Sequence, residues 1–445
     1  MTDSAPPRNH ASASLLLPTQ LVFNIGFYAV VPFLALVMSE DLGLGAAAVG
    51  LVLGARTFSQ QGMFLLGGVI ADRWGPRRSI LTGCIIRATG YFGLATSETF
   101  WPFLLSAVLT GIGGAFFSPA VEGLIGTLDR ASVSTNGTGA KDAPRRNLFA
   151  WLVLFGEIGA VTGPLIGIGL LPFGFPVVAV SAGCLFLAVG VALWLLLPGH
   201  AAGTETDVGI GAGPGREGSG SRSAFACLRD RRFVAFAAFF STNLLAYNQL
   251  YFALPLELED GGSGAGVLAV MFTLASALTI ALQLPMSALA ARLGPASALC
   301  SGFICIAAGF GAIALLGSTG MHLVPGLPTM TGPITLVILL SLGHMLVGPA
   351  GMQQVHRFAG QRSLGAYYGL LASCGGIAVL VGNSLTGVLR DTLGGAAGWA
   401  LLILLATFSA ALLPRFLPTA PARPAPPARS SSRVLPPVLD QKVQP

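Results

Sequence analysis

Apolar runs of about 20 residues recur along most of the sequence and constrain its fold more than any other feature. A helix needs about 20 residues to cross a hydrocarbon core of roughly 30 Å, because each residue adds about 1.5 Å. Only 9% of the residues are charged, whereas a soluble domain carries roughly 25%. Too few charges remain to cover a water-exposed surface, so the sequence predicts an integral membrane protein that crosses the bilayer many times.

Polar breaks divide the apolar sequence into twelve predicted transmembrane helices. Six precede a polar stretch and six follow it. The predicted spans are 15–38, 48–70, 79–97, 101–124, 147–170, 173–198, 233–256, 264–290, 296–316, 333–355, 364–389 and 396–417. The expected fold class is therefore an all-α membrane protein with its helices in two six-helix bundles.

The polar stretches define the expected domain organisation. Residues 199–232 are rich in Gly, Ser and charged residues and predict a flexible linker. Residues 418–445 are rich in Pro and Ser and predict a disordered tail. The N-terminal bundle is then expected in residues 1–198 and the C-terminal bundle in residues 233–417.

Positive charges are distributed unevenly among the loops. All Lys and Arg residues except Arg56, Arg87 and Arg390 lie in even-numbered loops or at the termini, whereas the odd-numbered loops carry acidic residues. Loops with an excess of Lys and Arg remain in the cytoplasm. The sequence therefore predicts a multi-pass protein of the cytoplasmic (inner or plasma) membrane, with both termini, the linker and the tail on the cytoplasmic side.

A short repeat relates the two predicted bundles. Residues 71–76 (ADRWGP) follow span 2 and residues 290–295 (AARLGP) follow span 8, and four of the six positions match. The two segments occupy equivalent loops in the two halves. Duplicated halves of this kind are typical of a large class of secondary transporters, although Ala, Gly and Pro also match by chance in so biased a sequence.

Residues 68–78 (GVIADRWGPRR) form the most informative loop. They resemble the signature G-x-x-x-D-R-x-G-R-K of the major facilitator superfamily, at the expected place between spans 2 and 3. The resemblance implies two pseudo-symmetric bundles around a central cavity and a charge cluster that latches one conformation. The implied latch consists of Gly68, Asp72, Arg73, Gly75, Arg77, Arg78 and Glu122.

Two contacts are expected of this latch. Glu122, at the cytoplasmic end of span 4, is the natural partner of an arginine in the loop. Pro76 occupies the position of the first base after the glycine, so the sequence leaves open which arginine pairs with Glu122. In the family the loop aspartate also faces the start of span 11, which places Asp72 opposite residues 363–365, where a helix start carries partial positive charge.

Span 5 contains a second motif, in which the glycines are spaced for close helix packing. Residues 159–167 (GAVTGPLIG) resemble the G-x-x-x-G-P-x-x-G motif that is associated with antiporters of this superfamily. Residues 56–62 (RTFSQQG) and 86–90 (IRATG) look like the corresponding stretches of bacterial multidrug-resistance exporters in the drug:proton antiporter family. The motif residues of span 5 are Gly159, Gly163, Pro164 and Gly167.

Three charged residues lie well inside predicted spans, namely Arg56, Arg87 and Glu157. A charge at the centre of a transmembrane helix costs roughly 2.5–3.5 kcal/mol on insertion scales, so such residues usually face the bundle interior and serve a substrate or proton path. We expect Glu157 to be the proton-coupling carboxylate. The alternative is a fixed ion pair with an arginine, which only locks the helices together.

Uncharged polar side chains in the spans are candidate substrate contacts. An interhelical hydrogen bond is the alternative role for each of them. The predicted cavity residues are Tyr28, Asn24, Gln60, Tyr247 and Asn248.

The residues and the resemblance together predict a secondary active transporter. We expect it to export small hydrophobic or cationic drugs, or antibiotics, by proton antiport through alternating access. One alternative is a proton-coupled uptake permease for a small nutrient, such as a sugar or an organic acid. The other is a non-transporting membrane sensor or scaffold, which would need a soluble domain that the sequence does not indicate.

No enzymatic motif is recognised in the sequence. It contains no phosphate-binding GxxxxGK[ST] loop, no metal cluster and no nucleophile motif. We therefore expect no catalytic residues, no metal and no cofactor beyond the proton gradient. The expected partners are the small-molecule substrate, protons and the lipid bilayer, without nucleic acid, and we expect the monomer to be functional.

Overall fold

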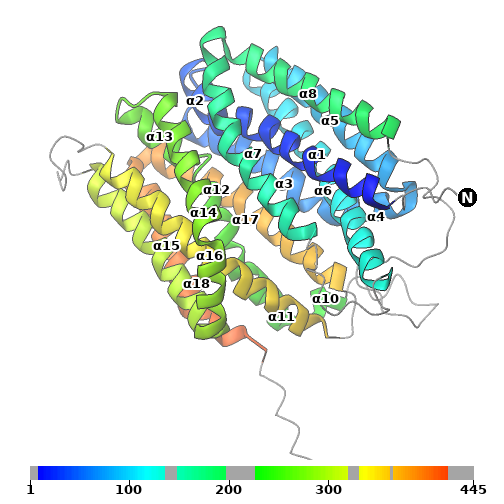
Figure 1. Ribbon diagram of the computed structural model, residues 1–445. Helices are drawn as coiled ribbons and strands as arrows, with labels where there is room; N and C mark the ends of the chain where they lie inside the picture. Colours follow the sequence, from blue (N-terminus) through cyan, green and yellow to red (C-terminus); the bar gives the residue numbers. More distant parts are fainter. Residues whose placement is uncertain (1–8, 136–147, 197–225, 319–329, 361–363, 419–445) are drawn as a thin grey trace, which may run out of the picture.

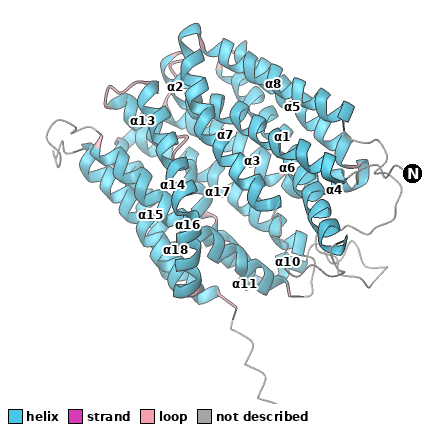
Figure 2. Cartoon of the chain, viewed as in Figure 1, coloured by secondary structure: helices cyan, strands magenta, loops and turns pink. Residues whose placement is uncertain are grey.

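The computed structural model describes residues 9–135, 148–196, 226–318, 330–360 and 364–418 (Figure 1). All regular secondary structure in these ranges is helical (Figure 2). The predicted all-α fold class is therefore confirmed. The predicted linker and tail lie almost entirely outside these ranges, and the last residues of the linker, from residue 226 on, are mostly helical.

The N-terminal helices follow the first six predicted spans. The segments that form span 1 are α1 (Asn9–Val30), the 3-10 turn η1 (Val31–Phe33) and α2 (Leu34–Glu40). Spans 2 to 6 are formed by α3 (Ala46–Gly62) with α4 (Phe64–Trp74), α5 (Pro76–Ala95), α6 (Phe100–Thr135), α7 (Leu148–Leu170) with η2 (Leu171–Phe173), and α8 (Phe175–Leu196). The largest difference from the predicted bounds is in α6, which continues past residue 124 to Thr135.

The C-terminal helices follow the other six spans. A short α10 (Ala226–Arg229) precedes span 7, which consists of α11 (Arg231–Phe240), α12 (Thr242–Asn248) and α13 (Ala253–Asp260). Spans 8 to 12 are α14 (Ala265–Leu293), α15 (Pro295–Ser318), α16 (Thr331–Ala359), α17 (Leu364–Leu393) and α18 (Gly395–Phe416).

Nine helical stretches within the described residues are long and apolar enough to cross a membrane. The other three predicted spans are helical as well. Spans 2 and 7 are each interrupted, so neither contains one helix of sufficient length. Span 3 is the single helix α5, whose apolar character is reduced by the charge of Arg87 in its middle. The helices are therefore consistent with the twelve predicted crossings.

The repeated Gly-Pro pairs have the same backbone geometry in both halves. Gly75 and Gly294 adopt φ angles of +82° and +78°, a region that glycine enters without the strain a Cβ would cause. The proline that follows each glycine begins the next helix, as Pro76 in α5 and Pro295 in α15. Proline suits this position because its fixed φ is helical and its missing N–H is not needed there. The sequence repeat is thus also a structural repeat.

The helices form two groups that each pack mainly on themselves. In the N-terminal group α1 contacts α7 and α8, and α5 contacts α6 and α8. In the C-terminal group α15 contacts α16 and α18. In Figure 1, α5 and α8 lie at one edge of the molecule and α15 and α18 at the opposite edge. The groups meet where α3 packs along α17 and α7 packs along α14.

Glycines bring the backbones of α3 and α17 into contact. A Cβ added at Gly50 would lie 2.9 Å from the carbonyl carbon of Asn383, and one at Gly54 would lie 2.8 Å from the Cα atom of Leu380. Gly387 of α17 lies in the same way against the backbone of α3. We call Gly50, Gly54 and Gly387 the glycine seam. Real Cβ atoms do not approach other atoms so closely, so the seam depends on residues without a side chain.

Candidate functional site

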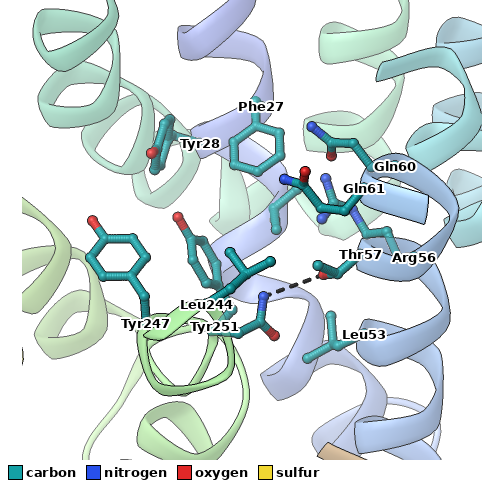
Figure 3. A pocket seen from close by; sticks show the side chains of 12 residues that line it. Phe27, Tyr28, Leu53, Arg56, Thr57, Gln60, Gln61, Leu244, Tyr247 and Tyr251 are labelled. Carbon is teal, nitrogen blue, oxygen red and sulfur yellow. Dashed lines mark hydrogen bonds between the residues drawn. The ribbon is translucent and has the colours of Figure 1, made fainter. Parts of the chain in front are cut away.

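A cavity of about 160 Å³ lies between the two groups of helices (Figure 3). Its wall is formed by residues of span 1, of α3 and of the region around the end of α12. The lining residues are Phe27, Tyr28, Val31, Leu53, Arg56, Thr57, Gln60, Gln61, Leu244, Tyr247, Asn248 and Tyr251. The cavity is therefore mixed in character, with aromatic, amide, hydroxyl and guanidinium groups on one surface.

Interrupted helices position this wall. Span 1 changes to a 3-10 turn at Val31, span 2 is interrupted after Gly62, and span 7 is interrupted between Asn248 and Ala253. Pro32 removes one backbone donor from the first interruption. Each interruption includes a lining residue or lies directly beside one. Irregular backbone at membrane depth is tolerated where it is buried in protein or lines a cavity, and all three interruptions meet this condition.

Aromatic rings form one side of the cavity. Phe27 lies edge-on to Tyr28, with ring centroids 4.9 Å apart, and edge-on to Tyr251 at 6.4 Å. The rings of Tyr28 and Tyr251 enter the cavity from different spans (Figure 3). Tyr247 is stacked on the imidazole of His344, with centroids 4.4 Å apart. These contacts hold the aromatic wall in a defined shape.

Arg56 provides the charge that lines the cavity. Only 4% of this residue is exposed, and its Cζ atom lies 4.8 Å from the ring centroid of Phe27. Its Nε and Nη2 atoms are buried and have no hydrogen-bond partner in the described part of the chain. Arg87 of α5, 5% exposed, approaches the same ring of Phe27 at 5.4 Å and the ring of Phe186 at 4.8 Å. Two cations therefore share one aromatic ring beside the cavity.

A chain of buried polar side chains links the two groups of helices beside the cavity. The Nδ2 atom of Asn248 donates to Thr57 Oγ1 at 3.3 Å, and Asn383 Nδ2 donates to Asn248 Oδ1 at 2.9 Å. Gln249 Nε2 in turn donates to Asn383 Oδ1 at 2.9 Å. The chain connects α3, the end of α12 and α17, so it joins the cavity wall to the glycine seam.

The structure brings together four of the five predicted cavity residues, since Tyr28, Gln60, Tyr247 and Asn248 all line the cavity. Asn24 does not, because it lies one turn earlier on α1 and packs against α7, where a Cβ added at Gly159 would be 2.6 Å from its Cβ atom.

Several lining residues carry little signal in the sequence. Phe27 and Tyr251 resemble ordinary apolar residues of a span. The one signal for Tyr251 is its spacing of four residues from Tyr247, which places both on one face of a regular helix.

Glu157 of α7 is half-buried and is not one of the cavity-lining residues. It lies within electrostatic reach of Tyr28 and Tyr247, two residues that do line the cavity. Among the described residues it forms no ion pair with Arg56 or Arg87. The fixed ion pair considered as its alternative role is therefore not formed in this conformation, and its role in proton coupling stays a prediction.

The span-5 motif forms the contact between α7 and α1. A Cβ added at Gly159 would lie 2.8 Å from the carbonyl oxygen of Leu21, and one at Gly163 would lie 2.5 Å from the Cβ atom of Tyr28. Gly167 abuts the backbone of Ala29 in the same way. Pro164 lies inside α7. The motif thus sets the position of α1, the helix that carries Phe27 and Tyr28.

The predicted latch loop is described only in part. The side chains of Asp72 and Glu122 lie outside what the structure describes, so their expected contacts stay predictions. Arg77 stacks on Trp194 at the end of α8, with Cζ 4.1 Å from the ring centroid, and donates a hydrogen bond to the carbonyl oxygen of that residue. Arg73 and Arg78 are exposed, and Gly68 has open space around it. Arg77 is therefore the arginine through which this loop packs against α8.

On the opposite face, where the odd-numbered loops lie, hydrogen bonds join the two groups. Asp391 at the end of α17 accepts a hydrogen bond from the amide of Ala46 at 2.9 Å and another from the amide of Ala47 at 2.8 Å, at the start of α3. Ser39 Oγ donates to Glu259 Oε1 at 2.9 Å. These contacts hold the two groups together on this face, which we call the odd-loop face.

Comparison with solved structures shows the same fold elsewhere. A POT family transporter, crystallised in complex with a thioalcohol-conjugated peptide, matches with a TM-score of 0.71 at 13% sequence identity. The match covers 91% of this chain and 96% of that chain. At this identity the likeness concerns the fold alone.

Sequence comparison gives the family. An uncharacterized MFS-type transporter of Mycobacterium tuberculosis strain H37Rv is 31% identical over 382 residues, which is 85% of each chain. The multidrug resistance protein MdtH of Escherichia coli strain SE11 is 27% identical over 387 residues, 86% of this chain and 87% of that protein. The sequence model of the Major Facilitator Superfamily matches residues 16–383. The resemblance found in residues 68–78 is thereby confirmed, and the chain belongs to the Major Facilitator Superfamily, whose members are membrane transporters and not enzymes.

Proposed function

We propose that this transporter exports small amphipathic compounds from the cytoplasm in exchange for protons, by alternating access to its central cavity. The observation that carries the proposal is the position of the cavity between the two groups of helices, against the interruptions of three spans. Substrate sites of secondary transporters lie at the interface of two repeats, where discontinuous helices meet.

The size of the cavity supports a carrier that changes shape. Its volume of about 160 Å³ is close to the roughly 150 Å³ of a protein cavity that binds benzene. Pockets for drug-sized ligands measure about 300–1,000 Å³. In this conformation the cavity accommodates a single aromatic ring, so a larger compound enters only when the two groups of helices move apart. Rocking of one group against the other supplies that movement.

The direction of transport rests on two observations. Relatives such as the MdtH protein of Escherichia coli strain SE11 bear the name multidrug resistance protein, and resistance by a transporter requires export. The glycines that pack α7 on α1 form the motif that resembles antiporters. Both observations favour export over the alternative of nutrient uptake.

Proton coupling is assigned to Glu157. It is an acidic side chain within a span, within electrostatic reach of Tyr28 and Tyr247 of the cavity wall and without an arginine partner among the described residues. A carboxylate that no fixed cation holds in the charged form can take up and release a proton as its access alternates. The driving force is then the proton gradient, and no other cofactor is involved.

Accumulation of a fluorescent antibiotic in an efflux-deficient bacterial host tests this function. Expression of the transporter should lower the accumulation, and a proton uncoupler should restore it to the level of the empty vector. A panel of antibiotics then gives the substrate range. If the uncoupler leaves the lowered accumulation unchanged, proton antiport is wrong. If expression raises accumulation and the uncoupler lowers it, the protein is an uptake permease.

The same proposal places the protein in the cytoplasmic membrane with both termini inside. Reporter domains fused after residue 445 and inserted at residue 262 of the α13–α14 turn should report opposite sides of the membrane. The C-terminal reporter should be active in the cytoplasm only. A cytoplasmic signal from both positions would contradict this orientation.

A further inference from the structure

We propose that the cavity selects compounds that carry a compact anionic group, a carboxylate, next to an aromatic ring, and that Arg56 is the charged contact for that group. This inference rests on the proposed transport function and names its substrate class. It differs from the sequence-based expectation, which included cationic drugs. The observation behind it is that Arg56 is buried at the cavity wall with donors that no group of the described residues accepts.

A buried guanidinium normally has an acidic partner, because an uncompensated charge is costly away from water. No acidic side chain that the structure describes forms an ion pair with Arg56 or Arg87. The described arginine that does form ion pairs is Arg390, whose Nη1 atom lies 3.1 Å from Glu257 Oε2 and which also binds Asp260. That cluster lies at the end of α17, away from the cavity.

The backbone also places Glu122 far from the two arginines. Gly113 of α6 lies beside Arg87, since a Cβ added there would be 2.6 Å from the Cβ atom of Arg87. Glu122 follows nine residues later on the same helix, which is roughly 13 Å at about 1.5 Å per residue. In α6 a second glycine, Gly111, lies against the carbonyl of Arg56, and the distance along the helix to Glu122 is larger still.

The aromatic wall compensates the charge only in part. The ring of Phe27 lies 4.8 Å from the Arg56 guanidinium and 5.4 Å from that of Arg87. A cation over a ring is attracted by its quadrupole, but here one ring serves two cations of the same sign. No nitrogen, oxygen or sulfur atom of the described residues accepts a hydrogen bond from Nε or Nη2 of Arg56. Unused donors of Arg56 therefore remain at the cavity wall, beside a second cation.

A carboxylate complements this surface. The planar guanidinium fork matches the two oxygens of a carboxylate, and such pairs are among the strong hydrogen bonds of proteins. Phe27 and Tyr251 offer ring faces and edges to an aromatic group beside the anion, and Gln60 and Gln61 offer further amide donors (Figure 3). A cationic compound of the same shape would lie close to Arg56, and repulsion between the two positive charges would weaken its binding.

Three planar probes of equal size test the inference, namely benzoate, benzamide and benzamidinium. The full chain is reconstituted in lipid nanodiscs, and binding is measured by saturation-transfer NMR with empty nanodiscs as the blank. Benzoate should bind roughly ten-fold or more tightly than either of the other probes, since hydrogen bonds to charged groups are worth about that factor. Equal affinity for the three probes in the unaltered protein would overturn the inference.

Variants assign the preference to a residue. Arg56→Gln should remove the preference for benzoate and leave benzamide binding within about two-fold, because only the charged fork is lost. Arg56→Lys should keep the sign of the preference but weaken it. Arg292→Gln removes a positive charge from an exposed position at the end of α14 and should change nothing. A folded Arg56→Gln protein that still prefers benzoate would show that Arg56 is not the contact.

These outcomes separate the inference from the proposed function. The binding experiment uses no proton gradient, so selective binding of benzoate together with uncoupler-insensitive accumulation would overturn proton antiport and leave the substrate class in place. Uncoupler-sensitive export with equal binding of the three probes would support proton antiport and overturn the substrate class. If Arg56→Gln yields no folded protein, the comparison of probes on the unaltered chain and on Arg56→Lys decides the matter.

Discussion

The carboxylate of Asp391 caps α3 across the interface, since its Oδ1 atom accepts a hydrogen bond from the amide of Ala46 at 2.9 Å. The residues belong to different groups of helices and lie 345 positions apart in the sequence. Helix starts carry unpaired amides and partial positive charge, so a carboxylate stabilises them. The resemblance to the family predicts the converse arrangement at the other face, where Asp72 follows span 2 and faces the start of span 11.

Replacing Asp391 with Asn should loosen the odd-loop face. The change removes the negative charge from the start of α3, and a charge at a helix start is worth about 0.3–1 kcal/mol, which corresponds to roughly a two- to five-fold change in population. We expect spin labels placed on α2 and α13 to show a larger fraction of long distances by pulsed electron resonance. Asp41→Asn, at an exposed position near the same face, is the control. An unchanged distance distribution in Asp391→Asn would show that the cap does not hold this conformation.

Substitution in the glycine seam should separate the two groups of helices. A Cβ at Gly50 would meet the carbonyl of Asn383, and backbone cannot yield as a side chain does. We expect Gly50→Ala to lower stability by about 1–3 kcal/mol, as overpacking does, and to reduce transport. Gly311→Ala, where an added Cβ would meet no atom outside the adjacent helix backbone within 4 Å, should lower neither. Thermal unfolding in detergent and drug accumulation measure the two effects, and equal melting temperatures for the two variants would contradict the prediction.

The buried amide chain should behave as one unit. Asn248→Ala leaves Asn383 without the oxygen that accepts its Nδ2 hydrogen bond, and an unsatisfied buried donor costs about 1–3 kcal/mol. Asn383→Ala should cost a similar amount. The double variant should cost less than the sum of the two, with a coupling of roughly 1 kcal/mol in a double-mutant cycle on the free energy of unfolding. Strict additivity would mean that the hydrogen bond contributes nothing.

Replacing the carboxyl group of Glu157 should uncouple transport from the proton gradient. Glu157→Gln keeps the shape of the side chain but can no longer release a proton. In vesicles, uphill export driven by an imposed pH gradient should fall at least about ten-fold, which corresponds to losing an essential group, whereas exchange of labelled for unlabelled substrate should persist. Glu98→Gln, at an exposed position in the α5–α6 turn, is the matched control. Normal uphill export by Glu157→Gln would assign the proton to another group.

The membrane fold was predictable from the sequence because it depends on a local property. Apolar runs reveal helices wherever the span is uninterrupted, as in α8 or α15. The Gly-Pro pairs at Gly75 and Gly294 were recognisable because a positive φ followed by a helix start demands these residue types. The interruption after Asn248 was only partly predictable. Pro255, in the first turn of α13, is a local signal that a helix begins there, but the contacts that stabilise the interruption come from α3 and α17.

The site was less predictable because it depends on neighbours that only the fold brings together. Tyr28 and Tyr247 were recognisable as polar groups in apolar spans, and both line the cavity. Asn24 has the same character, yet a single helical turn directs it toward α7. Arg77 could be assigned to the loop cluster, but its contact with Trp194 joins elements that are distant in the sequence. Sequence thus identified the kinds of residue and not their partners.

The glycine seam also has a consequence for inherited variation. Any single base change that replaces glycine introduces a side chain or a stop, so no conservative substitution is available at Gly50 or Gly54. A residue such as Gln60 can instead be exchanged for several other polar residues by one base change. Natural variants with an altered substrate range should therefore carry their changes on the cavity wall. The two helix backbones at the seam should remain the same in every functional descendant.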